Sequence, residues 1–489
     1  MAVGETRRPM TDLDLPSDQA GASHAGLKRL ARFGTVGFGA FSRVFALGSQ
    51  FVVLLLLGRL LPKTDFGDFM VAFALSRVLS QGIGTGLATL LVYHVSRNAG
   101  AERTHALHRS TALLGFAVAG AAAVLLVVAA PAISAAFGKP SLAFWVAGLA
   151  PFMLFGTLLT LGTGVTDGLG QISRSIALSE LVPNIIRLFA LPTLLFLGWG
   201  NHGVLVVMAA SVLVPWLVFA TMLFRLPAGG WARLTRWDLA YSGRLTMHSF
   251  AAMQMQGIDM LVAGWLFTSG QAADYAIASR VAALIPFFQQ IVVKGFMAHA
   301  GKAIHEGDLA RLQARVDGSR RTCVMLVGLT AAGAMAVYPA LLHFLGGFGG
   351  SMPLLALLAA GTLFRSYFPG LDALVRIAGH AKYSLRIMLA SVGLLLVLSP
   401  LLAPLFGPLA VAISMLVSAV TLNPLLARYI RRLFAIDLGT REMAVPMAIA
   451  TLGIVVALSP GLCSWYAGTL LLGASVISAR LYASKRWVA

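Results

Sequence analysis

The sequence has little charge and almost no cysteine. Only 11% of its 489 residues are Asp, Glu, Lys or Arg, whereas about a quarter of the residues of a soluble domain are charged. The two cysteines, Cys323 and Cys463, are expected near opposite membrane faces, so no disulfide framework is predicted. Long apolar runs dominate instead, with 58% hydrophobic residues and a mean hydropathy of +0.83. This composition argues against a soluble domain and predicts an all-α protein that crosses a membrane many times.

Fourteen segments are long and apolar enough to cross a membrane, since a hydrocarbon core about 30 Å thick needs ~20 residues of helix. We predict spans near 37–58, 67–93, 110–137, 141–165, 175–197, 203–224, 243–267, 272–298, 321–345, 353–375, 386–405, 408–427, 443–459 and 463–481. The last two are short. The connections between spans leave no room for a soluble domain on either side, so the function is expected within the bilayer.

Acidic residues are also scarce, with 18 Asp and Glu against 37 Lys and Arg. Of these basic residues, 28 fall in the N-terminal tail, the C-terminal end and the alternate loops on the same side. Only Arg59, Lys63 and Lys139 fall on the opposite side. Basic loops stay in the cytoplasm, so both termini are predicted there. The net charge of +19 is thereby explained without nucleic acid as a partner.

The sequence lacks the patterns that carry catalysis. We find no Ser-His-Asp set, no metal-ligand cluster and no paired carboxylates at useful spacing, so neither an enzyme nor a cofactor is expected. Residues 1–32 are polar and lack the short apolar core of a signal peptide. They are predicted to form a disordered cytoplasmic tail, with residues 27–33 as a short amphipathic lead-in on the membrane surface.

Two stretches of the chain match at a constant shift. "GRLLPKTDFGDFMVA" (58–72) aligns with "GWLFTSGQAADYAIA" (264–278), so that Gly58 meets Gly264 and Asp68 meets Asp274. The match pairs the first span with the seventh and the second with the eighth. It predicts two pseudo-symmetric six-helix lobes around a central cavity. The predicted domains are the tail 1–32, an N-lobe at 33–226 (spans 1–6), a C-lobe at 227–432 (spans 7–12), and 433–489 with the last two spans and the C-terminal tail.

Nine charged residues remain near or inside the spans, and charges there usually face protein or water rather than lipid. They are Arg43, Arg77, Glu180, Arg187, Asp259, Arg280, Lys294, Arg365 and Asp372. Several have ordinary explanations. Arg43 and Lys294 can extend to the membrane surface, Asp372 and Arg376 can form a helical ion pair, and Glu180 and Arg187 can pair with other helices.

Arg77 and Arg280 stand out because the repeat relates them. Arg280 aligns with Ala74, one helical turn before Arg77, so each lobe carries one arginine at mid-depth on its second helix. Asp259 is the possible charge partner of Arg280. Since six basic residues face only three acidic ones, some positive charge is expected to remain unpaired. A cationic cavity of this kind suits phosphate, which the planar guanidinium binds with a fork of hydrogen bonds.

Glycine and proline add local expectations. "GIGTG" (82–86) lies in a predicted span rather than after a strand, so we interpret it as a site of close helix packing and not as a phosphate loop. Prolines within or near spans are expected to kink helices. They are Pro151, Pro183, Pro192, Pro215, Pro286 and Pro339.

"GRLLPKTDFGDFMVAFAL" and "DYAIASRVAAL" resemble recurring signatures of the bacterial oligosaccharidyl-lipid flippases (Wzx-type, O-antigen and exopolysaccharide). This family belongs to the superfamily of multidrug, oligosaccharidyl-lipid and polysaccharide exporters. The resemblance implies two six-helix bundles around a cavity in the bacterial inner membrane. It also implies alternating access that moves undecaprenyl-pyrophosphate-linked oligosaccharide to the periplasmic leaflet.

The resemblance further suggests residues and partners. Arg280 and Arg77 are expected to bind the pyrophosphate, with Arg43 as a third base, and Arg365 is added for its depth alone. In the repeat alignment, Ser249 takes the position of Arg43. A symmetric ring of arginines around the cavity would need a basic residue there. Besides lipid-linked oligosaccharide and membrane lipids, partners would include a polysaccharide polymerase and chain-length or export proteins. No cofactor and no nucleic acid is implied.

Three other functions compete with this hypothesis. A purely structural membrane scaffold is one, but it would not need unpaired arginines at mid-depth. A multidrug extruder coupled to Na⁺ or H⁺ mostly moves cations, so its cavity should be richer in acids, and it usually stops at twelve helices. A polymerase or ligase of lipid-linked sugars would need a sizeable periplasmic loop with reactive residues, and the sequence contains none. Bases outnumber acids within the spans, which favours the flippase.

Overall fold

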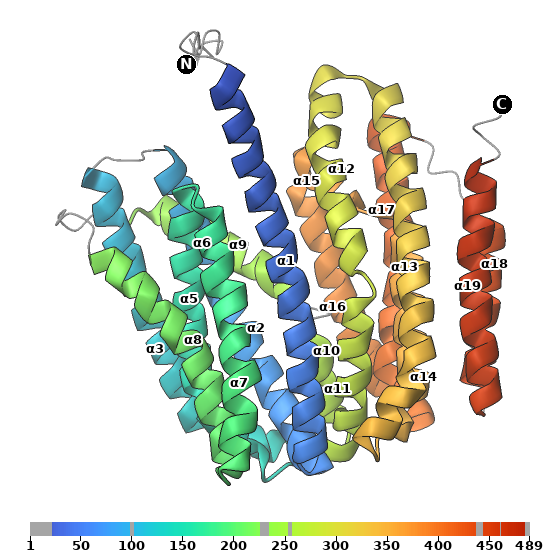
Figure 1. Cartoon of the computed structure of the whole chain (residues 1–489), viewed down its shortest axis with the longest axis horizontal. Coiled ribbons are helices and arrows are strands. Elements are labelled where there is room, and N and C mark those ends of the chain that lie inside the picture. Colours follow the sequence, from blue (N-terminus) through green and yellow to red (C-terminus); the bar gives the residue numbers. More distant parts are fainter. Residues whose placement is uncertain are drawn as a thin grey trace, which may run out of the picture.

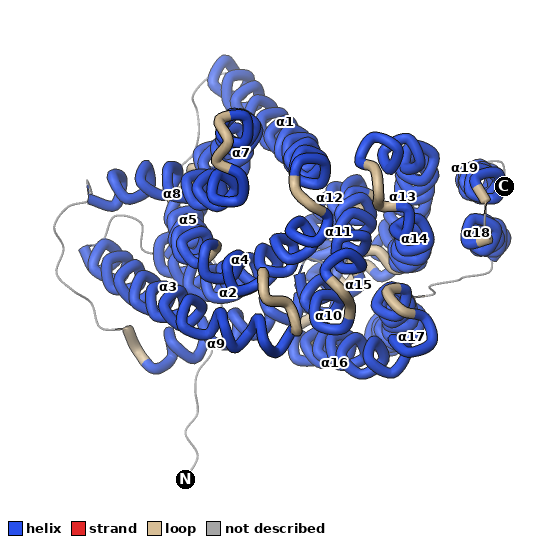
Figure 2. The backbone as a smooth tube through the Cα atoms, turned by 90° about the horizontal axis from the view of Figure 1, so that it is seen from below, coloured by secondary structure: helices blue, strands red, loops and turns tan. Residues whose placement is uncertain are grey.

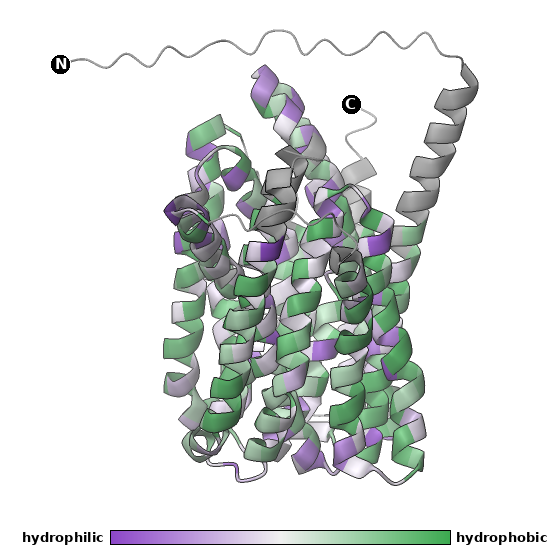
Figure 3. Cartoon of the chain, turned by 90° about the vertical axis from the view of Figure 1, so that its left-hand side faces the viewer, coloured by the Kyte–Doolittle hydropathy of each residue, from purple (hydrophilic) through white to green (hydrophobic). Residues whose placement is uncertain are grey.

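The protein is described here from a computed structural model, which covers residues 22–97, 102–224, 234–252, 257–436, 444–459 and 461–484. Within these ranges helices make up nearly all of the chain and there is no β-strand. The predicted all-α fold is therefore confirmed. Hydrophobic residues dominate the middle of the helices, and hydrophilic residues are more frequent toward their ends (Figure 3).

Every predicted span coincides with a helix or with consecutive helices. The first half contains α1 (Ala22–Leu60), α2 (Lys63–Arg97), α3 (Glu102–Phe137), α4 (Leu142–Gly148), α5 (Ala150–Gly168), α6 (Ile172–Ile176), the π-helical turn η1 (Ala177–Leu181), α7 (Val182–Phe196) and α8 (Gly200–Phe224). The second half contains α9 (Arg236–Ala252), α10 (Asp259–Leu266), α11 (Ser269–Leu284), α12 (Phe287–Glu306), α13 (Leu309–Leu345), the 3₁₀ turn η3 (Gly349–Ser351), α14 (Met352–Ser366), α15 (Leu371–Ile377), α16 (Ala381–Phe406), α17 (Leu409–Phe434), α18 (Ala444–Leu458) and α19 (Leu462–Ser484).

The membrane-crossing character of these helices follows from length and apolarity. In the described part of the chain, eight helices or helix pairs meet both criteria, and ten do if each of two bent pairs counts as one span. The bent pairs are α11 with α12 and α14 with α15. Two shorter apolar helices lie in α18 and α19. The protein is thus a multi-pass membrane protein.

The helices form two groups that meet along α2, α9, α10 and α11 (Figure 1). Helices α1 to α8 gather on one side, and α10 to α17 gather on the other. The start of α1 and the end of α19 lie at the same end of the molecule. We call the opposite end, where α2 and α11 begin, the outer end. The exact lobe boundary stays a prediction, since it falls at residues 226–227, outside the described ranges.

Small residues let α2 pack closely on both sides, as the glycine pattern predicted. A Cβ on Gly82 would lie 2.3 Å from the ring of Phe250 in α9, and one on Gly86 would lie 2.6 Å from the carbonyl oxygen of Ser242. Gly84 approaches Thr160 of α5 in the same way. Contacts this short are impossible for a larger residue. The "GIGTG" segment therefore holds α2 between α5 and α9, and the packing interpretation is confirmed.

The last two helices form a hairpin attached to the second half. α19 packs on α13 and α18 packs on α14, and the pair stands at the edge of the molecule (Figure 2). The indole Nε1 of Trp465 donates a hydrogen bond to the carbonyl oxygen of Met335, at 2.7 Å. This bond fixes the buried Trp465 ring against α13.

The predicted N-terminal tail is helical in its described part. Residues 22–32, predicted within a disordered tail, belong to α1, and so does the predicted surface segment 27–33. The Ala, Leu, Lys and Arg content of this segment favours helix, so the helix continues beyond its apolar part. The two cysteines are not bonded to each other, and Cys323 is buried while Cys463 is exposed.

Candidate functional site

An ion pair joins the two halves at the outer end. The Lys63 ammonium at the start of α2 lies 2.9 Å from both carboxylate oxygens of Asp274 in α11. It also donates a hydrogen bond to the carbonyl oxygen of Gly347, at 2.7 Å, and lies 5.2 Å from the centre of the Phe348 ring. One side chain of the first half therefore contacts three groups of the second half.

The backbones also approach closely here. A Cβ on Gly67 would lie 1.9 Å from the carbonyl oxygen of Ser269. Next to it, the Phe66 and Phe348 rings pack edge to face with their centres 5.9 Å apart. Only glycine allows α2 to come this near to the start of α11. The outer end is therefore closed by an ion pair, a glycine contact and an aromatic pair.

The repeat-related acid Asp68 lies in a different setting. It is fully buried and accepts a hydrogen bond from Ser141. Lys139, in the connection between α3 and α4, is buried next to it; burial lowers the pKa of this ammonium, and the Asp68 carboxylate opposes the shift. Asp68 and Asp274 thus each have a lysine nearby, but only Asp274 has one from the other half.

Four arginines lie further along the helices, away from the outer end. Arg77 of α2 lies within electrostatic range of Arg187 of α7 and Arg280 of α11. Arg280 and Arg365 of α14 both lie within range of Asp259 of α10. All four arginine side chains are half-buried, whereas Asp259 is buried. We call these five residues the arginine cluster. It joins both halves of the fold, and α11 places Arg280 about 9 Å along the helix from Asp274.

One acid cannot neutralise this cluster. The Tyr275 hydroxyl donates a hydrogen bond to Asp259, at 3.0 Å, so the single carboxylate serves one hydroxyl and lies near two guanidinium groups. Among the described residues, neither Arg77 nor Arg280 forms an ion pair. The cluster therefore keeps a net positive charge in an environment where Coulomb interactions are strong. It is suited to an anion with several negative oxygens.

The sequence prediction missed Arg187 and Tyr275 as members of this region. Arg187 was expected to pair with another helix, and its Nε does donate a hydrogen bond to Ser211 of α8, at 2.9 Å. Its guanidinium also lies 5.6 Å from the centre of the Phe152 ring. Neither Ser211 nor Phe152 carries a charge, so the positive charge of Arg187 adds to that of Arg77. In the sequence, the position of Arg187 within a predicted span was the signal that could have assigned it to this region.

Other charges lie outside the cluster. Arg43 is 3.9 Å from Glu180, and both side chains are partly exposed, so Arg43 pairs with an acid in a π-helical turn. Lys294 is exposed. Arg376 and Asp372 form the predicted helical ion pair at 3.0 Å. In the described ranges no group of three or more His, Cys, Asp or Glu is placed to hold a metal ion.

Removing the outer ion pair is expected to loosen the outer end. Lys63→Ala would leave the mostly buried Asp274 without its counter-charge, which costs about 1–3 kcal/mol and favours separation of the halves. Spin labels at two exposed outer positions, Leu197 in the first half and Leu405 in the second, should show a longer distance by pulsed electron resonance. Arg59→Ala, an exposed base nearby, should leave the distance unchanged. An unchanged distance in Lys63→Ala would contradict the role of the pair.

Comparisons with known proteins identify the family of the chain and similar folds. A model of the polysaccharide biosynthesis protein family matches residues 36–294, more than half of the chain. A search of curated protein sequences gives no significant match. Among solved structures, the lipid II flippase MurJ in its inward closed conformation superposes with a TM-score of 0.72 and 13% identity, over 93% of this chain and 99% of that one.

Multidrug transporters share the fold as well. The inward-facing conformation of a MATE family transporter of the MOP superfamily superposes with a TM-score of 0.68 and 14% identity, over 80% of this chain and 94% of that one. An outward-facing MATE structure gives a TM-score of 0.57 at 14% identity, over 82% and 95% of the two chains. At these identities the likeness establishes the fold alone. The predicted fold of two helical bundles is confirmed.

Proposed function

This chain belongs to the polysaccharide biosynthesis protein family, and from that premise we propose that it flips undecaprenyl-pyrophosphate-linked oligosaccharide across the bacterial inner membrane. The glycan would move from the cytoplasmic to the periplasmic leaflet for surface or exopolysaccharide synthesis. The termini would lie in the cytoplasm. This assignment makes the protein a transporter, with lipid-linked oligosaccharide as its substrate and a polysaccharide polymerase and chain-length or export proteins as its partners.

The net positive charge of the arginine cluster carries the proposal. A pyrophosphate linkage brings two negative charges to mid-membrane depth, where an unpaired charge is costly. Arg77 and Arg280 supply guanidinium groups from the two halves without an ion-pair partner among the described residues. Binding pyrophosphate would neutralise the substrate and reduce the positive charge of the cluster. Arg365 would assist from the second half, while Arg43, paired with Glu180, would act at the edge of the path.

The closed outer end fits an alternating-access cycle. With Lys63, Gly67 and Phe348 closing that end, the cluster would be reached from the cytoplasmic side in this state. Pyrophosphate bound between Arg77 and Arg280 would draw the halves together on the cytoplasmic side. The outer contacts would then break and release the glycan to the periplasm.

A multidrug extruder is the second candidate, because transporters of that kind share the fold. Its mostly cationic substrates would meet like charge at the arginine cluster, where four arginines face one aspartate. The charge of the site therefore favours an anionic substrate.

Deletion of the gene in its host would test the proposal. Loss of the flippase should reduce surface polysaccharide and trap lipid-linked repeat units in the inner leaflet, and the wild-type chain should restore both. Unchanged glycan together with new sensitivity to cationic drugs would overturn the proposal in favour of the extruder. Unchanged glycan without drug sensitivity would reject both candidates.

A further inference from the structure

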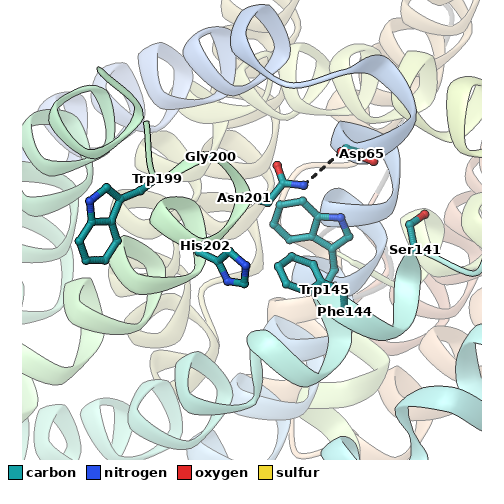
Figure 4. A pocket seen from close by; sticks show the side chains of 8 residues that line it. All are labelled: Asp65, Ser141, Phe144, Trp145, Trp199, Gly200, Asn201 and His202. Atoms are coloured by element: carbon teal, nitrogen blue, oxygen red, sulfur yellow. Dashed lines mark hydrogen bonds between the residues drawn. The ribbon is translucent and has the colours of Figure 1, made fainter. Parts of the chain in front are cut away.

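A pocket of about 470 Å³ lies at the outer end, apart from the arginine cluster. It is lined by Asp65, Ser141, Phe144, Trp145, Trp199, Gly200, Asn201 and His202 (Figure 4). All eight residues belong to the first half of the fold. The volume falls in the range of small-molecule sites, about 300–1,000 Å³.

Three segments build this pocket. Asp65 lies in the first turn of α2, and Phe144 and Trp145 lie on the short helix α4. The remaining side is the Trp199–His202 segment, where the chain turns from α7 into α8. Gly198 and Gly200 have positive φ values of 80° and 50° there, a conformation that glycine adopts at low cost. This turn places the Trp199 ring at the rim, with half of its surface exposed.

The lining combines aromatic faces with hydrogen-bonding groups. Phe144 packs edge to face against both Trp145 and His202, with ring centres 5.2 Å apart in each pair. The side-chain amide of Asn201 donates a hydrogen bond to Asp65, at 3.2 Å. A carboxylate and an amide held together beside aromatic rings can bind adjacent hydroxyl groups while the rings cover the C–H face of a pyranose.

The charge of the lining selects among ligands. Asp65 is the only formally charged residue among the eight, and no Lys or Arg lines the pocket. A carboxylate repels phosphate and acidic sugars, so this pocket cannot share the pyrophosphate with the arginine cluster. A neutral, hydroxyl-rich ring fits both its charge and its aromatic faces.

We propose that this pocket is a sugar-binding site for a neutral residue of the glycan at the outer face of the protein. The inference rests on the proposed flippase function for the source of the sugar. Asp65 is two residues from Lys63, which closes the outer end, but residues two apart on a helix point to different sides. The pocket therefore lies at the outer end on the side of the first half. A glycan that has left the path between the halves would reach this pocket on the outer face of the first half, late in transport.

Sugar binding can be measured without transport. Purified protein in lipid nanodiscs would be mixed with glucose, galactose, N-acetylglucosamine or glucuronic acid, and saturation-transfer NMR would report binding. We expect at least one neutral sugar to bind and glucuronic acid to bind more weakly. Phe144→Ala and Trp199→Ala should weaken the neutral sugar at least 5-fold. Asp65→Asn should reduce the preference for the neutral sugar over the acid, an effect that a merely structural role would not produce.

A matched control separates the pocket from the aromatic residues common at membrane surfaces. Trp265 ends α10 near the outer end and is 50% exposed, against 52% for Trp199. Trp265→Ala should leave sugar binding unchanged. Absence of binding by all the neutral sugars, or an equal loss in Trp265→Ala, would overturn the inference. Because no flipping is needed, a failure here is distinguishable from a failure of the gene-deletion test.

Discussion

Replacing Arg280 with alanine is expected to reduce delivery of lipid-linked glycan about 10- to 100-fold, since hydrogen bonds to a charged group contribute about 1.5–3 kcal/mol. The loss would fall on the substrate because Arg280 forms no ion pair with the described residues, and Asp259 keeps its hydrogen bond from Tyr275. The measurement is surface polysaccharide in the deletion strain carrying each variant, with the amount of membrane-inserted protein determined in parallel.

Two further variants show whether the loss is specific to Arg280 and whether its charge alone is sufficient. Lys294→Ala removes an exposed base from the same half and should restore surface polysaccharide fully. Arg280→Lys keeps the charge but loses the planar fork, so partial rescue would show that charge contributes apart from geometry. Full rescue by Arg280→Ala would refute the assignment of Arg280 to the substrate.

Gly67→Ala is expected to shift the protein away from the closed outer state. The added Cβ would lie 1.9 Å from the carbonyl oxygen of Ser269, and backbone cannot move aside as a flexible side chain can. Overpacking of this kind costs about 1–3 kcal/mol, which changes the ratio of two states roughly 5- to 150-fold. The spin-label distance between Leu197 and Leu405 should increase, and glycan delivery should fall because the cycle can no longer close.

Gly270 is the matched control for this substitution. It lies three residues before Ala273 on α11, and a Cβ there would meet nothing within 4 Å. Gly270→Ala should therefore change neither the distance nor delivery. If Gly67→Ala also left the distance unchanged, the close approach of α2 and α11 would not control closure.

The spans could be predicted because the bilayer imposes one rule on every segment. Each long apolar run must satisfy its own backbone hydrogen bonds, so hydropathy located the helices. The positions where a helix ends and the next begins were only partly predictable from the prolines. Pro151 and Pro183 lie at the start of α5 and α7, and Pro286 lies between α11 and α12. Pro192, Pro215 and Pro339 remain inside single helices, because the outcome depends on neighbours that can accommodate the missing hydrogen bond.

The candidate site was also only partly predictable from the sequence. The repeat related Arg77 to Arg280, and the structure brings them within electrostatic range. Asp259 was expected as a partner of Arg280 alone, yet Tyr275 donates to it and Arg365 lies near it. Which groups share one acid depends on how α10, α11 and α14 are rotated, and hydropathy does not specify rotation. The outer pocket was not predicted either, since its walls come from three segments that are distant in sequence.

The hairpin of α18 and α19 gives the second half a larger contact with membrane lipid than the first half has. It packs on α13 and α14, so it travels with the second half and enlarges the perimeter that this half must drag through lipid. Viscous resistance grows with that perimeter. If the halves separate during transport as proposed, the first half is expected to turn through the larger angle relative to the bilayer. The half that carries Arg77 would then be the more mobile one.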